Sequence, residues 1–242
     1  MTELSKKVRG VVDIVFLLDI TGSMQPCIDA LKNHIGTFID TLSMKDANSS
    51  SPIRDWRARV VGYRDHRHNP DDWLEEQPFV ADAAALRAQL SSLEAAGGGD
   101  EPESLLDALY IVSKWPQSDR GALDAGKWRY RSEATRVVVV FTDASFHAEM
   151  TIPDAKGGVF RDDVMNALIA SRVILTVFAP DLACHHELAM LNKSVYECIP
   201  VPDGTTPQQA LEQFTGSSEG FKKTMAQLAM SVSQSASVPL AD

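Results

Sequence analysis

Three side chains with oxygen atoms alternate near the start of the chain, where Asp19, Thr21 and Ser23 are separated by Ile20 and Gly22. Carboxylate and hydroxyl oxygens, with no Cys or His among them, suit a hard cation such as Mg²⁺, Mn²⁺ or Ca²⁺. A phosphate site is disfavoured because no Lys follows Gly22 and the carboxylate of Asp19 would repel the anion. The alternative is that the two hydroxyls only cap a helix.

The residues around this motif predict a strand that runs directly into a helix. Residues 11–18 are apolar except for one acid, as in a strand that is buried on both faces of a parallel sheet. Ser23 is a good N-cap, Pro26 suits a first helical turn, and apolar residues recur at helical spacing over 27–42. Asp19 therefore lies on a turn at the carboxyl end of a strand, where open α/β sheets place their ligand sites.

A second apolar run, RVVVVFTD over residues 136–143, also ends in an acid. Two such strands in one parallel sheet would bring Asp19 and Asp143 together where the strand order reverses. Strands and helices alternate along the chain, which predicts an α/β fold with a doubly wound, mostly parallel sheet and helices on both faces. The further expected strands are 56–63, 73–80 as a weak antiparallel edge, 173–178 and 195–201; the expected helices are 82–93, one starting at Pro102, 160–171, 181–192, 206–214 and 221–231. Residues 114–133 are expected to form a packed surface excursion.

Four stretches of the sequence resemble motifs of the von Willebrand factor type A (VWA) domain, and they lie in the order found in its bacterial and alpha-kinase-linked members. These stretches are DITGSM at 19–24, GYRDH at 62–66, GGGDEPE at 97–103 and TDASFH at 142–147. The resemblance extends over about residues 11–230 and implies a Rossmann-like fold with a metal-ion-dependent adhesion site (MIDAS). By that resemblance, Thr21 and Ser23 would bind the metal directly, and Asp19 and Asp143 would anchor it.

The third ligand loop departs from the pattern of the family, which usually presents a Thr there. No Thr occurs between residues 42 and 134. We expect Asp100 to take its place as a metal ligand, with Glu101, Glu103 or Ser104 as alternatives. A purely structural reading is a glycine-rich loop followed by an acidic helix N-terminus.

The stretch GYRDHRH at 62–68 is expected to reach the rim of the site. Asp65 would hold a metal-bound water or orient Thr21, and Arg64 would pair with nearby acids. His147, at the end of the fourth motif, is assigned to the same rim. A solvated charged loop is the alternative, and zinc is disfavoured because the spacing of the histidines matches no zinc motif.

The composition limits the remaining possibilities. With 242 residues, 44% of them hydrophobic, the chain can form the core of one large domain, which we expect over 11–230 between an N-terminal extension (1–10) and a flexible tail (231–242). A net charge of −10 without a basic stripe argues against nucleic-acid binding. The sequence shows no signal peptide, no long apolar span and no metal spacing among its three cysteines, which predicts no membrane association and a cytoplasmic location.

The resemblance implies a noncatalytic module that binds a partner protein, since the metal in this family has an open coordination position that accepts a carboxylate from the partner. Bacterial relatives act beside ATPases, kinases or phosphatases, so we expect a bacterial multi-protein stress or defence system. The enzymatic alternative is an Mg²⁺-dependent phosphatase-like hydrolase with Asp19 as nucleophile. It is disfavoured because such enzymes need a second Asp at the position of Thr21, and no Gly-x-Ser-x-Gly elbow surrounds Ser23.

Overall fold

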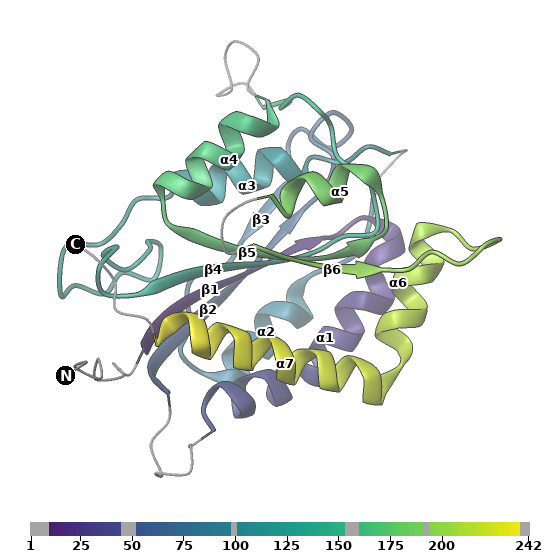
Figure 1. Cartoon of the computed structure of the whole chain (residues 1–242). Helices are drawn as coiled ribbons and strands as arrows, with labels where there is room; N and C mark the ends of the chain where they lie inside the picture. The colour runs from purple at the N-terminus through teal and green to yellow at the C-terminus, as the bar shows by residue number, and fades with distance from the viewer. Residues whose placement is uncertain (1–9, 45–51, 98–100, 153–159, 191–193, 238–242) are drawn as a thin grey trace, which may run out of the picture.

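A six-stranded sheet forms the centre of the described residues, which are 10–44, 52–97, 101–152, 160–190 and 194–237 of the computed structural model (Figure 1). Its strands are ordered β3-β2-β1-β4-β5-β6. Their bounds are β1 (Gly10–Asp19), β2 (Ile53–Tyr63), β3 (Leu74–Glu76), β4 (Thr135–Phe141), β5 (Val173–Pro180) and β6 (Val195–Ile199). β3 pairs antiparallel with β2, and the other neighbouring strands are parallel.

Helices cover both faces of the sheet (Figure 1). One face carries α1 (Gln25–Leu42), α2 (Ala83–Ser92), α6 (Pro207–Gly216) and α7 (Ser218–Ala236). The other carries α3 (Leu105–Lys114), α4 (Arg161–Ala170) and α5 (Ala183–Leu188). The predicted α/β fold is therefore confirmed. Among the helices that the structure describes, none combines the length and the apolar composition that crossing a membrane requires.

The direction of winding reverses between β1 and β4, which are neighbours in the centre of the sheet. From β1 the chain proceeds to β2 on one side, whereas from β4 it proceeds to β5 and β6 on the other side. Ligands of open α/β sheets bind outside the carboxyl ends of the strands at such a switch point. A ligand site is therefore expected at the carboxyl ends of β1 and β4.

Alternate residues of β1 supply both hydrophobic cores. Phe16 and Leu18 pack against α1 and its neighbours, whereas Val15 and Leu17 pack against α3 and α4. Each of these side chains is fully buried, and burial of one such side chain stabilises the fold by about 1.5–3 kcal/mol. This two-sided burial explains the nearly unbroken apolar runs before Asp19 and Asp143.

Two predicted boundaries are wrong at the edges of the fold. β3 covers only Leu74–Glu76 of the predicted edge 73–80, because Pro78 has no N–H group and interrupts the ladder. Antiparallel pairing with β2 returns at Val80, which lies opposite Ala58. The flexible tail predicted from residue 231 is wrong for residues 231–236, because α7 continues to Ala236 and buries its side chain in the core. Gly10 permits this approach, since a Cβ atom at Gly10 would lie 2.4 Å from the carbonyl oxygen of Ala236.

The polar connection between α3 and β4 packs on the sheet. Trp128 is fully buried, and its indole N–H donates to the carbonyl of Val112 at 3.0 Å. The guanidinium of Arg59 lies over the ring of Trp115, with its central carbon 3.9 Å from the ring centroid. This is the packed surface excursion that the sequence predicts.

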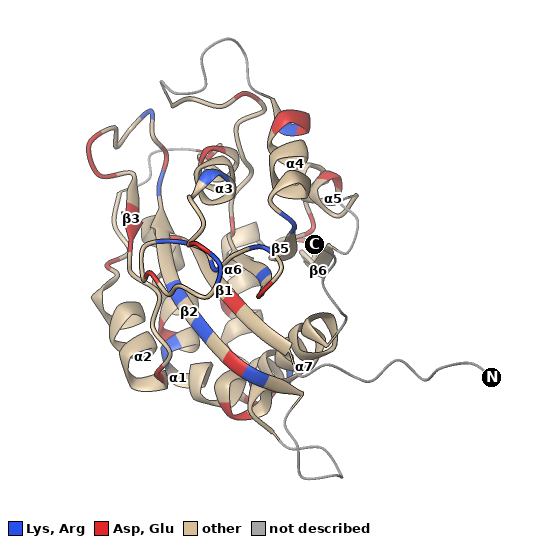
Figure 2. Cartoon of the chain, turned by 90° about the vertical axis from the view of Figure 1, so that its left-hand side faces the viewer, with Lys and Arg blue, Asp and Glu red and all other residues tan. Residues whose placement is uncertain are grey.

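Asp13, the acid inside the apolar run of β1, is fully buried and forms ion pairs with two arginines. Figure 2 shows acidic and basic positions on the neighbouring ribbons of β1 and β2. Arg57 on β2 binds both of its carboxylate oxygens, at 2.8 and 2.7 Å. Arg129, from the connection before β4, donates to Asp13 through its guanidinium at 2.9 Å and through its backbone N–H at 2.8 Å. The charge of Asp13 is therefore paired and fully hydrogen-bonded.

Candidate metal centre

Asp19 ends β1 and is fully buried. Its Oδ1 atom accepts hydrogen bonds from the backbone N–H and the hydroxyl of Thr21, at 2.9 and 2.7 Å. The short helix η1 (Gly22–Met24) follows this turn, so Met24 rather than Ser23 is the N-cap of α1. The predicted capping by Ser23 is therefore wrong, and Thr21 makes no capping bond either.

Thr142 and Asp143 follow β4 and contact the same turn. Thr142 donates its hydroxyl to Oδ2 of Asp19 at 2.9 Å, and the hydroxyl of Ser23 is hydrogen-bonded to the carboxylate of Asp143. Asp143 is buried, and its Oδ1 has no hydrogen-bond partner in the described part of the chain. The structure thus brings Asp19, Thr21, Ser23 and Asp143 to one place at the switch point.

The third loop reaches the site through Glu103, whereas the predicted ligand Asp100 lies outside the described residues. Glu103 is 4% exposed, and its Oε2 has no hydrogen-bond partner among the residues described. Its backbone N–H donates to the carbonyl of Ser145 at 2.8 Å, and its carbonyl accepts from the N–H of His147 at 3.0 Å. Because these bonds hold Glu103 extended, α3 begins at Leu105 rather than at Pro102 as predicted.

Glu101 and Ser104 lie on either side of Glu103 in this loop, and both side chains are hydrogen-bonded. The carboxylate of Glu101 accepts from the N–H and the hydroxyl of Ser145, at 3.2 and 2.9 Å. Ser104 is fully buried, donates its hydroxyl to Asp65 at 3.1 Å and accepts from the N–H of His66 at 3.0 Å. Both side chains therefore hold the loops around the site together.

Asp65 connects three loops at the rim. Its carboxylate lies 2.9 Å from Nε2 of His147 and 2.5 Å from Nδ1 of His68, in addition to the bond from Ser104. Burial raises the pKa of Asp65, but the hydrogen bonds from His147 and His68 outweigh this effect, so the pKa lies below its usual value. Thr21 is oriented by Asp19, so the expectation that Asp65 orients it is wrong.

Arg64 pairs with a nearby acid, as expected, but that acid is Glu75 rather than one of the described acids of the site. Its guanidinium donates to Glu75 at 2.8 Å and to three backbone carbonyls, including those of Glu94 and Ala96 at 3.0 and 2.9 Å. The N–H of Ala96 donates in turn to the carbonyl of Ile20 at 3.0 Å. Arg64 therefore fixes the segment that precedes the glycine-rich loop beside the Asp19 turn.

The charges of the site are not balanced. The ion pairs formed within the described ranges leave out Asp19, Glu103 and Asp143. Burial and the neighbouring Asp143 raise the pKa of Asp19 to about 7. Burial, followed by the charges of Asp19, Asp65 and Asp143, raises the pKa of Glu103 to about 8. Burial also raises the pKa of Asp143. A buried group of acids without a counter-charge binds either protons or a cation.

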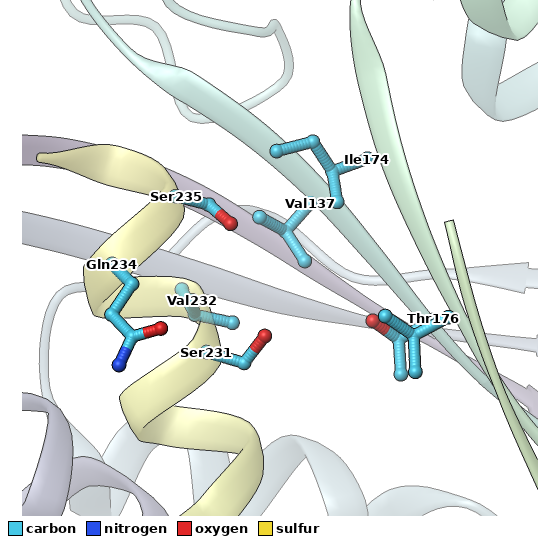
Figure 3. Close-up of a pocket in the computed structure, with 8 residues that line it drawn as sticks. Val137, Ile174, Thr176, Ser231, Val232, Gln234 and Ser235 are labelled. Atoms are coloured by element: carbon cyan, nitrogen blue, oxygen red, sulfur yellow. The ribbon is translucent and has the colours of Figure 1, made fainter. Parts of the chain in front are cut away.

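A cavity with different chemistry lies elsewhere in the fold. It has a volume of about 340 Å³ and separates α7 from β4, β5 and β6 (Figure 3). Its lining includes Val137, Ile174 and Thr176 on the strands and Ser231, Val232 and Ser235 on α7. None of its lining residues is an acid, a base or a cysteine, so it is not part of the carboxylate site.

Thr142, which donates to Asp19, is not among the predicted site residues, and Glu103 was predicted only as an alternative to Asp100. The signal for Thr142 was its place directly before Asp143, where a strand-terminal hydroxyl points to the same switch point as the acid. The burial of Glu103 had no such signal, because it depends on the pairing of this loop with residues 145–147.

These observations define an α/β protein with an acidic site at its switch point, and comparisons with known proteins agree with that fold. No protein-family model matches the chain. A curated relative, alpha-protein kinase vwkA of Dictyostelium discoideum, is 25% identical over 169 residues, which are 67% of this chain and 24% of the kinase. The chain thus spans about a quarter of the length of that relative.

Two solved structures of proximal thread matrix protein 1 from the mussel byssus are similar to this chain. One matches 89% of this chain and 46% of its own, with a TM-score of 0.52 at 14% identity. The other matches 87% of this chain and 47% of its own, with a TM-score of 0.51 at 13% identity. A von Willebrand factor type A protein from Catenulispora acidiphila matches 87% of this chain and 43% of its own, with a TM-score of 0.49 at 15% identity. This chain spans less than half of each of these chains. At such identities the likeness concerns the fold alone, and the two byssus structures support an α/β fold of this kind for the chain.

Proposed function

We propose that this chain is a noncatalytic, VWA-type module that binds a partner protein through a divalent cation at the Asp19 site. The observation that carries the proposal is the buried group of Asp19, Asp143 and Glu103, which has no cationic partner among the described residues and lies beside the hydroxyls of Thr21 and Ser23. A hard cation such as Mg²⁺, Mn²⁺ or Ca²⁺ would supply the missing positive charge.

The hydrogen bonds of the site are compatible with such an ion. A hydroxyl oxygen can donate its hydrogen to a carboxylate and still offer a lone pair to a metal. Thr21 already donates to Asp19 in this way, and Ser23 is hydrogen-bonded to Asp143. Both hydroxyls would therefore bind the ion directly, while the two acids orient them. Glu103, or Asp100 from the same loop, would complete the protein ligands.

The partner would supply a carboxylate. Mg²⁺ retains several waters when proteins provide few ligands, and Ser23 is exposed, so the site opens toward solvent. An acidic side chain of another protein would replace one of these waters. The resemblance further suggests a cytoplasmic, bacterial multi-protein stress or defence system, which the genes next to this one would test.

The phosphatase-like alternative has less support. Its nucleophile would be Asp19, yet both oxygens of this carboxylate accept hydrogen bonds, from Thr21 and from Thr142. Thr21 also occupies the position of the general acid that such enzymes require. We therefore propose binding without turnover.

Calorimetric titration of the chain with Mg²⁺, Mn²⁺ and Ca²⁺ tests the metal site. We expect one ion per chain, lost in Asp19→Asn and retained in the control Asp29→Asn, which removes an exposed acid of α1. A pull-down with and without EDTA then tests the partner. Metal binding that persists in Asp19→Asn would contradict the site, and metal-dependent phosphatase turnover lost in the same variant would contradict the noncatalytic function.

A further inference from the structure

A second group of side chains that could bind a metal also lies near the carboxyl ends of the strands. It is next to β5 and β6 rather than at the switch point between β1 and β4. It consists of Asp181, His186 and Cys198, and one ligand atom from each lies within 4.8 Å of the other two. All three side chains are exposed. Their spacing in the sequence matches no zinc motif, because each one comes from a different element of the fold.

Strand pairing fixes the positions of Asp181 and Cys198. Asp181 directly follows β5, and Cys198 lies in β6, opposite Ala179 in the parallel register. The backbone N–H of Asp181 donates to the carbonyl of Ile199 at 3.0 Å. The carboxylate and the thiol are therefore held side by side by the sheet itself.

α5 brings His186 to this pair. The neighbouring His185 is fully buried and anchors the helix, with its ring nitrogens 2.9 Å from the carbonyl of Pro180 and 3.1 Å from that of Ala144. The ring of Tyr196 stands edge-on to that of His186, with 5.1 Å between centroids. The Tyr196 hydroxyl donates to the carbonyl of Pro180 at 2.6 Å. These contacts place His186 with Nε2 only 2.7 Å from Oδ1 of Asp181.

We propose that Asp181, His186 and Cys198 form a binding site for a divalent transition metal of the zinc class. Thiolate and imidazole ligands select such metals over Mg²⁺ and Ca²⁺. Three protein ligands with a fourth position left for water is a common zinc arrangement, with bonds of about 2.0–2.3 Å. Ligand atoms around such an ion lie roughly 3.3–3.8 Å apart, so small rotations of exposed side chains suffice.

Binding of the ion displaces two hydrogens. The thiol of Cys198 releases its proton to solvent, since the thiolate is the metal ligand. The hydrogen between Nε2 of His186 and Oδ1 of Asp181 must also leave Nε2, so that this nitrogen can bind the metal. The neutral imidazole then carries its one proton on Nδ1. The site thus consumes no oxidant or reductant, and binding weakens as the pH falls.

A nucleophilic role for this cysteine has less support. Partial loss of solvation and the charge of Asp181 hold the pKa of the Cys198 thiol above its usual value. The free thiol is therefore protonated near neutral pH and is a weak nucleophile. A bound cation reverses this balance by stabilising the thiolate.

Cobalt titration tests the proposal on the full chain in excess Mg²⁺, which occupies the Asp19 site. We expect one Co²⁺ per chain, with the strong ultraviolet band of thiolate-to-cobalt charge transfer, and displacement of that Co²⁺ by one equivalent of Zn²⁺. Cys198→Ser should abolish the band, and His186→Ala should weaken Zn²⁺ binding at least about tenfold. The control Cys184→Ser changes a cysteine of α5 outside the group and should leave both unchanged.

Three outcomes would overturn the site. The first is no charge-transfer band in the unmodified chain, and the second is equal Zn²⁺ affinity in the unmodified chain, Cys198→Ser and His186→Ala. The third is a band that is lost in Cys184→Ser but retained in Cys198→Ser, which would place the metal elsewhere. Asp19→Asn should leave the cobalt spectrum unchanged, so this proposal and the proposed function fail independently.

Discussion

Neutralising Asp19 should stabilise the metal-free protein while abolishing stabilisation by metal. The pKa of this fully buried carboxyl rises from 3.8 to about 7 on folding. The native state therefore holds a proton at pH values where the unfolded state has lost it. The stabilisation that this proton gives the native state is fully present below the pKa of the unfolded state. It falls as the pH rises from about 4 to 7 and is constant at higher pH.

The size of the effect follows from the shift. Each pKa unit corresponds to about 1.4 kcal/mol, so Asp19 should make the metal-free protein about 4 kcal/mol less stable above pH 7 than below pH 4. About 3 kcal/mol of this loss should fall between pH 5 and pH 8. Asn has nearly the same shape and does not ionise, so Asp19→Asn should be more stable than wild type at pH 8, by a margin that disappears toward pH 4.

Urea unfolding in EDTA, from pH 5 to pH 8, measures this margin, because the difference between wild type and Asp19→Asn cancels the titrating groups that do not interact with Asp19. Addition of Mg²⁺ at a hundredfold excess over its Kd should then stabilise wild type by about 2.7 kcal/mol and leave the variant unchanged. A pH-independent difference between the two proteins, or equal stabilisation of both by Mg²⁺, would refute the reasoning.

Three further predictions concern the surroundings of the site. Titration of Glu103→Gln and Asp100→Asn with Mg²⁺ should identify the acid of the third loop that binds the ion. We expect one of the two variants to lose affinity at least about tenfold. Affinities equal to that of wild type in both variants would place both acids outside the ligand set. Asp65→Asn should lower the free energy of unfolding by about 1–3 kcal/mol, because it weakens the hydrogen bonds that join three loops, and an unchanged urea midpoint would contradict this role. Asp13→Ala should cost about 3–5 kcal/mol because it removes the buried carboxylate that both Arg57 and Arg129 bind, and a melting temperature close to that of wild type would show that the cluster relaxes.

The sequence predicted the features that depend on local patterns. The apolar runs before Asp19 and Asp143 require burial on both faces of a parallel sheet, and their ends must meet if the two strands are neighbours. This reasoning located the switch point and most of its oxygen atoms. It misjudged Ser23, because a turn of 3-10 helix separates that residue from α1.

Long-range partners were beyond such reasoning. Arg64 carries a charge that could pair with any nearby acid, and only the folded chain shows that Glu75 and three carbonyls bind it. Glu103 is buried because its backbone pairs with residues 145–147, which lie more than forty positions further along the chain. Cys198 and His186 become neighbours through the β5–β6 register, which no spacing rule encodes.

The two ends of β1 treat a buried acid in opposite ways, and this contrast has a consequence for redesign of the protein. Asp13 is closed off by Arg57 and Arg129, so no ligand can reach its charge. Asp19 has only hydroxyl and amide donors among the described residues, so its charge is left available. The positions of the arginine side chains therefore decide whether a buried acid of β1 forms an internal ion pair or stays available to a bound ligand. A basic side chain introduced next to Asp143 would repeat the arrangement around Asp13 at the other end of β1. It would neutralise the acidic site internally, so that the site would no longer need a cation.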